Sequence, residues 1–310
     1  MIAAPSPGTW VWIRRAAVVV AVVALALALV QTWDQSRGLP LSSPPRLALA
    51  ALCLVVALLV AGRAWCDLVE QPPRQVLPGF LVAQLGKYVP GGVWQAVGQV
   101  EAASHDGVPR SRGAMAFLVM AVVQVVAGLV VAGPLVVVAA APVWARVVAG
   151  FAPLAVVLLH RAWMLEVVRR LARWRRLAHL GAGTVPSQRA ILVATARMLL
   201  VFVLLGVALQ LSLPGPFDGS ATTGLVAAHA LAWVAGFLVV PLPAGLGARE
   251  AVLVLAAGWH ADVGALLAAS VVVRLLQIVT EGVLAATTRV IWGRRAPAHG
   301  AAPGTHRDEP

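Results

Sequence analysis

The sequence predicts an all-α, polytopic helical membrane protein, and three observations support this fold class. Of its 310 residues 60% are hydrophobic and only 12% are charged, whereas a soluble domain carries about 25% charged residues. Apolar runs long enough to span a bilayer, which takes roughly 20 residues, recur between residues 16 and 292. The basic residues gather at the N-terminus, at 63–112 and at 161–189, and the connections between these clusters are almost uncharged. This alternation is the positive-inside pattern of an inner-membrane protein.

The charge distribution and the absence of reactive motifs argue against several functional classes. The net charge of +12 resides in these topology-setting clusters, so we expect no nucleic-acid partner. Cys53 and Cys66 would lie about 20 Å apart along one helix, which is too far for a disulfide. No two histidines have metal-ligand spacing, and there is no phosphate-binding loop or nucleophile motif. We therefore expect no metal, no cofactor and no enzymatic activity.

The N-terminal part of the chain is predicted to cross the membrane twice. Residues 1–15 carry two arginines and are expected to be cytoplasmic. The apolar run that follows gives a first span at about 16–33, which we interpret as a retained signal anchor. After a proline-rich connection, the second span covers about 47–64. The chain thus returns to the cytoplasm at the basic segment 65–113.

The segment 65–113 combines apolar sequence with helix breakers. An apolar run at 76–84 is followed by GKYVPGGVWQ (86–95), which holds the only lysine of the chain. Proline and glycine interrupt a helix because proline lacks the amide donor and glycine is conformationally free. We predict a shallow hairpin over 76–101 that enters from the cytoplasmic side, with KYVPGG at its tip.

Three further spans are predicted in the middle of the chain, at about 114–138, 144–160 and 190–213. The arginine-rich loop 161–189 lies between the last two of them and is placed in the cytoplasm. The loop 214–222 has no basic residue and is placed outside.

The breaker sequence PLPAGLGARE (241–250) separates a long apolar run from a short one, 251–259, ahead of the last helix at about 263–292. That helix must end in the cytoplasm, next to two arginines, whereas the loop after the fifth span lies outside. The segment 223–259 must therefore enter and leave the membrane on its outer side. This predicts a second re-entrant hairpin, with PLPAGLGARE at its tip.

These elements form one transmembrane domain over 16–292, with about six full spans and two broken-helix hairpins. The count rises to seven or eight spans if the hairpins cross completely. Residues 293–310 are expected to be a disordered cytoplasmic tail. Broken helices that enter from opposite faces are typical of inverted-repeat transporters, whose sites lie near the bilayer midplane. We expect a multi-pass protein of the bacterial plasma (inner) membrane with both termini in the cytoplasm.

The last helix carries the clearest candidate site. Ser270, Arg274, Gln277 and Glu281 fall at i, i+4, i+7 and i+11, which places all four on one helical face. An arginine near mid-membrane costs roughly 2.5–3.5 kcal/mol on insertion scales, so such residues face the bundle interior or a wet cavity. The face is either a polar lining for an anionic headgroup or a structural polar seam. Arg274 and Glu281 are two turns apart and are not expected to form a tight pair.

The two breaker motifs supply the other candidate residues. In the second motif, Pro243, Gly245 and Gly247 free backbone amides, and Arg249 and Glu250 open the short helix, whose N-terminus suits an anion. The alternative is an interfacial loop with a snorkelling Arg249.

The first motif has the same construction. Its candidates are Lys87, Tyr88, Pro90, Gly91, Gly92, Trp94 and Gln95. The lysine can hold a phosphate as a point charge, and the Pro-Gly-Gly triplet exposes amides. Alternatively the motif is an interfacial anchor, because Lys, Tyr and Trp all favour the headgroup level.

The motifs together resemble a known family. GKYVPGGVW (86–94), VPRSR (108–112), PLPAGLGARE (241–250), VRLL (273–276) and Glu281 follow one another in an order similar to that of the flippase-like integral membrane family related to the N-terminal transmembrane domain of lysylphosphatidylglycerol synthases. The resemblance covers roughly residues 10–295. It implies a multi-span domain that binds a lipid or moves it between leaflets. The soluble aminoacyl-transfer domain of the synthases is not expected here, so synthase activity is not carried over.

This chain departs from the family pattern at two positions. Gly92 stands where many relatives have a basic residue, and Gln124 where relatives often have an acidic one. The resemblance therefore implies no particular headgroup.

The leading interpretation is an integral membrane protein that binds and translocates a lipid, either an anionic phospholipid or a polyprenyl-phosphate-linked lipid. The alternative is a non-transporting membrane scaffold for a cell-envelope lipid-modifying or glycosyltransferase enzyme, docked through the arginine-rich loop. The expected partners are a membrane lipid and, in addition, a cell-envelope enzyme or a second copy of the chain.

Overall fold

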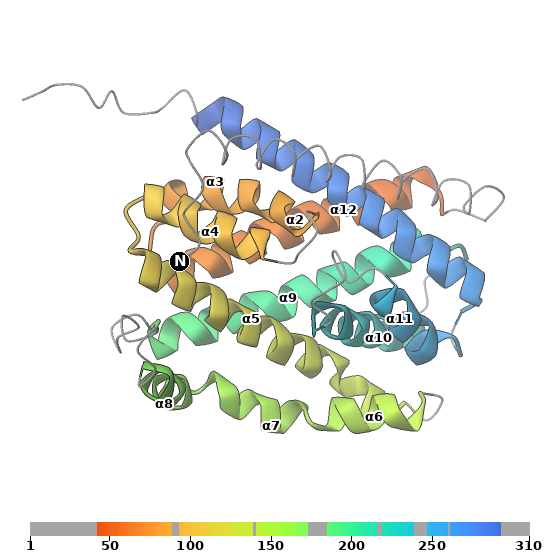
Figure 1. Cartoon of the computed structure of the whole chain (residues 1–310). Helices are drawn as coiled ribbons and strands as arrows, with labels where there is room; N and C mark the ends of the chain where they lie inside the picture. The colour runs from red at the N-terminus through yellow and green to blue at the C-terminus, as the bar shows by residue number, and fades with distance from the viewer. Residues whose placement is uncertain are drawn as a thin grey trace, which may run out of the picture.

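A computed structural model of the chain describes residues 42–88, 93–138, 141–172, 185–215, 219–238, 247–259 and 261–292. Every regular element within these ranges is a helix (Figure 1), which confirms the all-α prediction. The predicted first span, 16–33, lies outside the described residues, as do the N-terminal segment 1–15 and the tail 293–310.

Four of the described helices are long and apolar enough to cross a membrane. They are α2 (Pro44–Val69), α5 (Arg110–Ala132, extended by the 3-10 turn η2, Gly133–Val136), α9 (Gln188–Ser212) and α12 (Val263–Trp292). They correspond to the second, third, fifth and last predicted spans. The shortest of them, α5, is about 35 Å long at 1.5 Å per residue and so exceeds the roughly 30 Å of a bilayer core.

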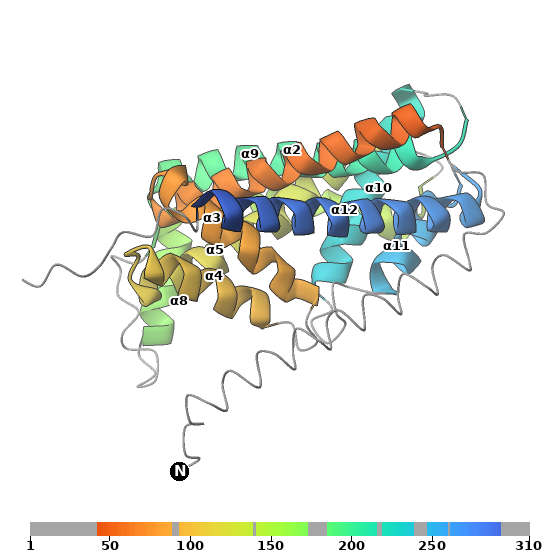
Figure 2. The ribbon, with the colours of Figure 1, turned by 90° about the horizontal axis from the view of Figure 1, so that it is seen from above.

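Helices α2 and α9 run side by side (Figure 2), and α12 packs across both of them at an angle that Figure 1 shows. α2 and α9 are antiparallel and are joined at both ends. At one end Arg46 Nη1 donates to the carbonyl oxygen of Gly215 at 2.6 Å, and at the other the amide of Ser187 donates to Glu70 Oε1 at 3.0 Å. These bonds fix the register of the two helices.

The first breaker motif forms a helical hairpin. α3 (Pro73–Ala83) continues into the 3-10 turn η1 (Gln84–Tyr88), and α4 (Trp94–His105) packs back against both. Glycine allows this approach, since a Cβ on Gly86 would lie 2.8 Å from the amide nitrogen of Gln95. Two helices that pack together thus flank the motif, of which residues 89–92 lie outside the described structure. That this segment is a hairpin entering the membrane from the cytoplasmic side stays a prediction.

The second breaker motif also separates two helices that pack together, α10 (Gly219–Leu238) and α11 (Ala248–Ala257). α10 is surrounded by other helices, and the continuous stretch 225–232 is buried. This burial explains why that stretch is apolar all round apart from one histidine. α11 is only about 15 Å long, half a bilayer core, as the prediction of a broken hairpin requires.

The predicted fourth span, 144–160, is not one continuous helix. It consists of α6 (Val143–Gly150), α7 (Ala152–Val156) and the 3-10 turn η3 (Val157–Leu159). Gly150 and Pro153 interrupt it, because proline cannot donate the amide bond that continues a helix. Together these pieces reach only about 25 Å even if fully helical.

The following arginine-rich segment, predicted as a loop, begins as a helix, α8 (Arg161–Ala172). Within it Arg170 Nε lies 2.8 Å from Glu166 Oε1, one turn away. Helix formation is natural here, because arginine has high helix propensity and this i, i+4 pair adds to it. Residues 173–184 lie outside the described ranges.

Candidate functional site

The first hairpin reaches α12 through Glu281. Lys87 Nζ lies 2.5 Å from Glu281 Oε1, and the Tyr88 hydroxyl donates to Glu281 Oε2 at 2.9 Å. The Glu281 side chain is only 2% exposed. Both oxygens of this buried carboxylate are therefore bound by consecutive residues at the end of η1.

The second hairpin reaches α12 through Arg274. Its Nη2 atom lies 2.7 Å from Glu250 Oε1, and both side chains are 17% exposed. The other oxygen of Glu250 accepts from the amide of Gly247 at 2.8 Å, which closes the start of α11. Gly247 has a φ of +81°, a conformation that glycine adopts without strain. The breaker motif thus fixes the carboxylate that holds Arg274.

Arg249 points into the same region but has a neutral partner. Its Nη2 donates to His229 Nε2 of α10 at 2.7 Å, and His229 is 1% exposed. A guanidinium can only donate, so the proton of the neutral imidazole sits on Nδ1. The Arg249 charge lies within electrostatic range of Arg274 and Glu250. Its buried Nε atom has no hydrogen-bond partner among the described residues.

Seven side chains thus gather where the two hairpins meet α12, and we call them the charge cluster. They are Lys87, Tyr88, His229, Arg249, Glu250, Arg274 and Glu281. Its ionic groups are three cations and two carboxylates. The intervening segments 89–92 and 239–246 contain no ionisable residue. The cluster combines fixed positive charge with free donors at a junction of broken helices, which is suited to binding an anion.

The sequence-predicted residues divide into three groups. Lys87, Tyr88, Arg249, Glu250, Arg274 and Glu281 belong to the cluster, and Gly247 caps its second hairpin. As expected, Arg274 and Glu281 have different partners. Outside the described residues lie Pro90, Gly91, Gly92, Pro243 and Gly245, whose roles stay predictions.

The remaining candidates lie in α12 and at the start of α4. Ser270 is buried and Gln277 is partly buried in α12, and neither side chain bonds a cluster residue in the described structure. Trp94 opens α4. Gln95 Nε2 donates to Gln84 Oε1 at 3.1 Å, inside the first hairpin, so this glutamine joins α4 to η1.

Sequence reasoning missed His229. Its neighbour Arg249 lies in another element 20 residues away, so no spacing within one helix connects the two. The available signal was a lone polar side chain in the continuous apolar run that precedes the second motif.

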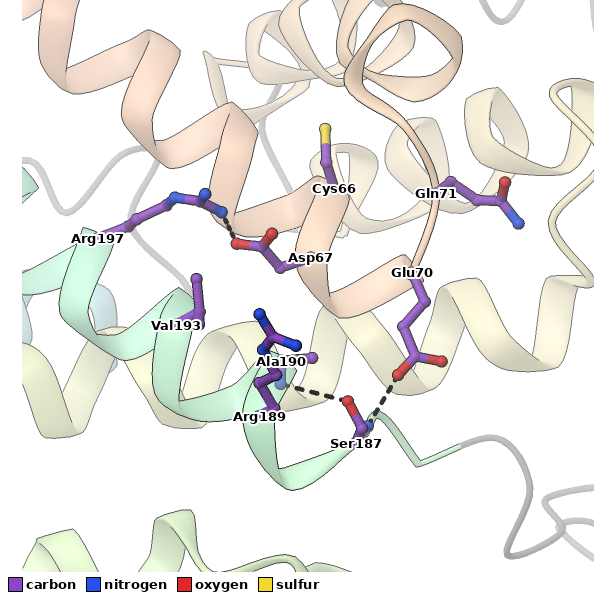
Figure 3. A pocket seen from close by; sticks show the side chains of 9 residues that line it. All are labelled: Cys66, Asp67, Glu70, Gln71, Ser187, Arg189, Ala190, Val193 and Arg197. Atoms are coloured by element: carbon purple, nitrogen blue, oxygen red, sulfur yellow. Dashed lines mark hydrogen bonds and ion pairs between the residues drawn. The ribbon is translucent and has the colours of Figure 1, made fainter.

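A separate groove of about 400 Å³ lies between the end of α2 and the start of α9 (Figure 3). It is lined by Cys66, Asp67, Glu70, Gln71, Ser187, Arg189, Ala190, Val193 and Arg197. Asp67 and Arg197 form an ion pair across it, and none of the predicted site residues contributes to it. The described residues contain no group of three side chains suited to a metal ion.

Comparison of the chain with models of known protein families finds no match, and comparison with curated proteins finds none either.

Proposed function

We propose that this protein binds a lipid with an anionic headgroup in the bacterial plasma membrane and moves it between the leaflets. One observation carries the proposal: two hairpins, each broken by a Pro/Gly motif, meet the polar face of one long apolar helix in a cluster with three cations. The activity is non-covalent, so the lipid is neither modified nor cleaved.

Physical reasoning supports a ligand rather than a seam alone. Ionisable residues inside a membrane are costly and are usually functional. Glu281 and Lys87 satisfy each other, but the buried Arg249 Nε remains without a partner among the described residues. A buried donor left unpaired costs about 1–3 kcal/mol. An anionic headgroup at this junction would supply the missing acceptor.

The proposed topology follows from the basic residues. Both termini are cytoplasmic, and about six spans cross the membrane if the interrupted segment 143–159 is counted as one of them. The hairpins enter from opposite faces; seven or eight crossings result if the hairpins pass through completely. This arrangement would place the cluster between the leaflets. The resemblance to the flippase-like family related to lysylphosphatidylglycerol synthases agrees with the proposal.

Reconstitution into liposomes with a trace of fluorescent phosphatidylglycerol tests the function. A membrane-impermeant quencher removes outer-leaflet fluorescence at once, and any further loss reports translocation. We expect the wild type to translocate the lipid, and Arg274→Gln to slow it roughly 10- to 100-fold, the value of one hydrogen bond to a charged group. A panel with polyprenyl-phosphate lipids tests the second lipid class.

Arg110→Gln is the matched control, because Arg110 also pairs with a glutamate, Glu101, at 2.8 Å but is largely exposed. It should translocate at the wild-type rate. If the wild type translocates none of the tested lipids, the proposal is wrong, and the scaffold alternative is then tested by crosslinking in cells.

A further inference from the structure

Building on the proposed function, we propose that the anion seat is the pair of guanidinium groups of Arg249 and Arg274, and that its charge suits one negative charge, the charge of a phosphodiester headgroup. Lys87, which the sequence offered either as a phosphate ligand or as part of an interfacial anchor, is assigned a positioning role instead. A phosphomonoester or diphosphate headgroup would carry too much charge for this seat.

Lys87 is already neutralised. Its ammonium group is 2.5 Å from a Glu281 oxygen, and Tyr88 occupies the other oxygen. Because Glu281 is 2% exposed, moving Lys87 to a ligand would leave a buried carboxylate without its counter-charge, which is strongly unfavourable. The pair therefore holds η1 against α12 and leaves the binding of an anion to other groups.

Arg274 is only partly committed to Glu250. The ion pair is short, at 2.7 Å, yet the buried Nη2 atom lacks a well-directed hydrogen bond. Glu250 itself is shared, since its second oxygen accepts from the Gly247 amide. Arg274 can therefore keep this counter-charge and still donate to a ligand through its other nitrogen atoms, because a guanidinium has five donors.

Arg249 forms no ion pair with a carboxylate in the described structure, although its charge lies within electrostatic range of Glu250. Its side-chain partner is the neutral His229, its Nε is free of a partner in the described structure, and the charge of Arg274 repels it. Arg249 directly precedes Glu250, whose carboxylate holds Arg274 at 2.7 Å, so the two guanidinium groups are neighbours of one carboxylate. Their repulsion is unfavourable in a low dielectric unless an anion lies between them. An anion bound to both would satisfy the free donors and remove the repulsion.

The charge count sets the class of headgroup. The three cations and two carboxylates of the charge cluster leave a surplus of one positive charge. A phosphodiester cancels it, whereas a phosphomonoester dianion would leave one negative charge desolvated and uncompensated, which is unfavourable. A zwitterionic headgroup brings no net charge to cancel the surplus. The same phosphodiester chemistry could come from a lipid or from a small soluble diester, so the experiment separates them.

The test measures binding to the purified full-length protein in neutral detergent by native mass spectrometry at pH 8, where a phosphomonoester carries close to two charges. The probes are phosphatidylglycerol, phosphatidic acid, phosphatidylethanolamine and the soluble diester glycerophosphoglycerol. We expect phosphatidylglycerol to bind roughly tenfold or more tightly than either other lipid. Retention of the soluble diester would show that the headgroup alone suffices, and its competition with phosphatidylglycerol would then show that both occupy the same seat. Loss of the soluble diester would show that the acyl chains contribute to binding.

Two substitutions change the charge count in opposite directions. Glu250→Gln raises the surplus to two while its amide oxygen can still accept from Gly247, so the preference should shift at least tenfold toward phosphatidic acid. Arg249→Gln removes the surplus and should weaken phosphatidylglycerol binding roughly 10- to 100-fold. Glu101→Gln and Arg110→Gln make the same charge changes at an exposed pair and should alter neither preference. Thermal unfolding of each variant identifies any that fail to fold, for which Glu250→Ser and Arg249→Met serve instead.

Equal or tighter binding of phosphatidic acid to the wild type overturns the inference, as does an unchanged preference in Glu250→Gln or an absence of any lipid binding. Selective binding of phosphatidylglycerol without translocation in liposomes would refute the proposed transport and leave the anion seat standing. Translocation without the charge preference would refute the anion seat and leave the proposed transport standing.

Discussion

At the scale of single residues, the site depends on how each charge is matched. Glu281 is bound by Lys87 and Tyr88, and this carboxylate is the most deeply buried ionic group of the cluster. A buried ion pair gains little over an apolar pair, but removing one partner is costly because the other stays charged. Glu281 and Lys87 should therefore behave as a unit in folding.

We expect Glu281→Gln to lower the free energy of unfolding by about 3 kcal/mol, the lower end for a broken buried pair, since Lys87 remains 21% exposed. Denaturation in mixed micelles measures it. The double variant Lys87→Met/Glu281→Leu should recover most of the loss, because neither charge is left alone. Glu101→Gln, at an exposed pair with Arg110, should change stability little, because an exposed ion pair contributes little. A double variant no more stable than Glu281→Gln would contradict the pairing.

At the scale of elements, glycine sets how closely the helices pack. A Cβ on Gly206 of α9 would lie 2.7 Å from the Cα of Val226 in α10. That neighbour is backbone and cannot rotate away, so the two helices can approach this closely only with glycine. Small residues at helix interfaces serve the same purpose in other membrane bundles. This contact holds α10, and with it His229, at its distance from α9.

Gly206→Ala should therefore destabilise the protein by about 1–3 kcal/mol through overpacking, although alanine is the better helix former. Gly282→Ala in α12 is the matched control, since nothing lies within 4 Å of its Cβ position, and it should be neutral or slightly stabilising. Thermal unfolding in detergent compares them. If both substitutions had the same effect, close packing at Gly206 would not limit the helix separation.

The elements also show what the sequence could and could not predict. Pro/Gly breaks and helical periodicity located both hairpins and the polar face of α12. The break in the 144–160 run was missed, because Gly150 and Pro153 interrupt the helix without making the run less apolar. The pairing of Lys87 with Glu281, 194 residues away, and the contact of Arg249 with His229 depend on tertiary packing. Periodicity within one helix carries no information about either.

At the scale of the whole molecule, the two hairpins meet α12 at different points along its length. The first hairpin reaches Glu281 and the second reaches Arg274, two turns nearer the start of the helix. In Figure 2, α3, α4 and α11 all lie on one side of α12. The hairpins therefore converge on one face of α12 from its two ends, the geometry expected if one enters from each side of the membrane.

Cysteine labelling in intact cells tests this opposed entry. With Cys53 and Cys66 replaced by alanine, His105→Cys probes the base of the first hairpin and Val263→Cys the loop that follows the second. His105 is the last residue of α4 and Val263 the first of α12, and both are exposed, so the changes should not disturb packing. A membrane-impermeant maleimide should label the second variant in intact cells, because the positive-inside rule places that loop outside. It should label the first only after the membrane is opened. Labelling of both from one side would mean that the hairpins share an entry face, and the site would then be open to one leaflet.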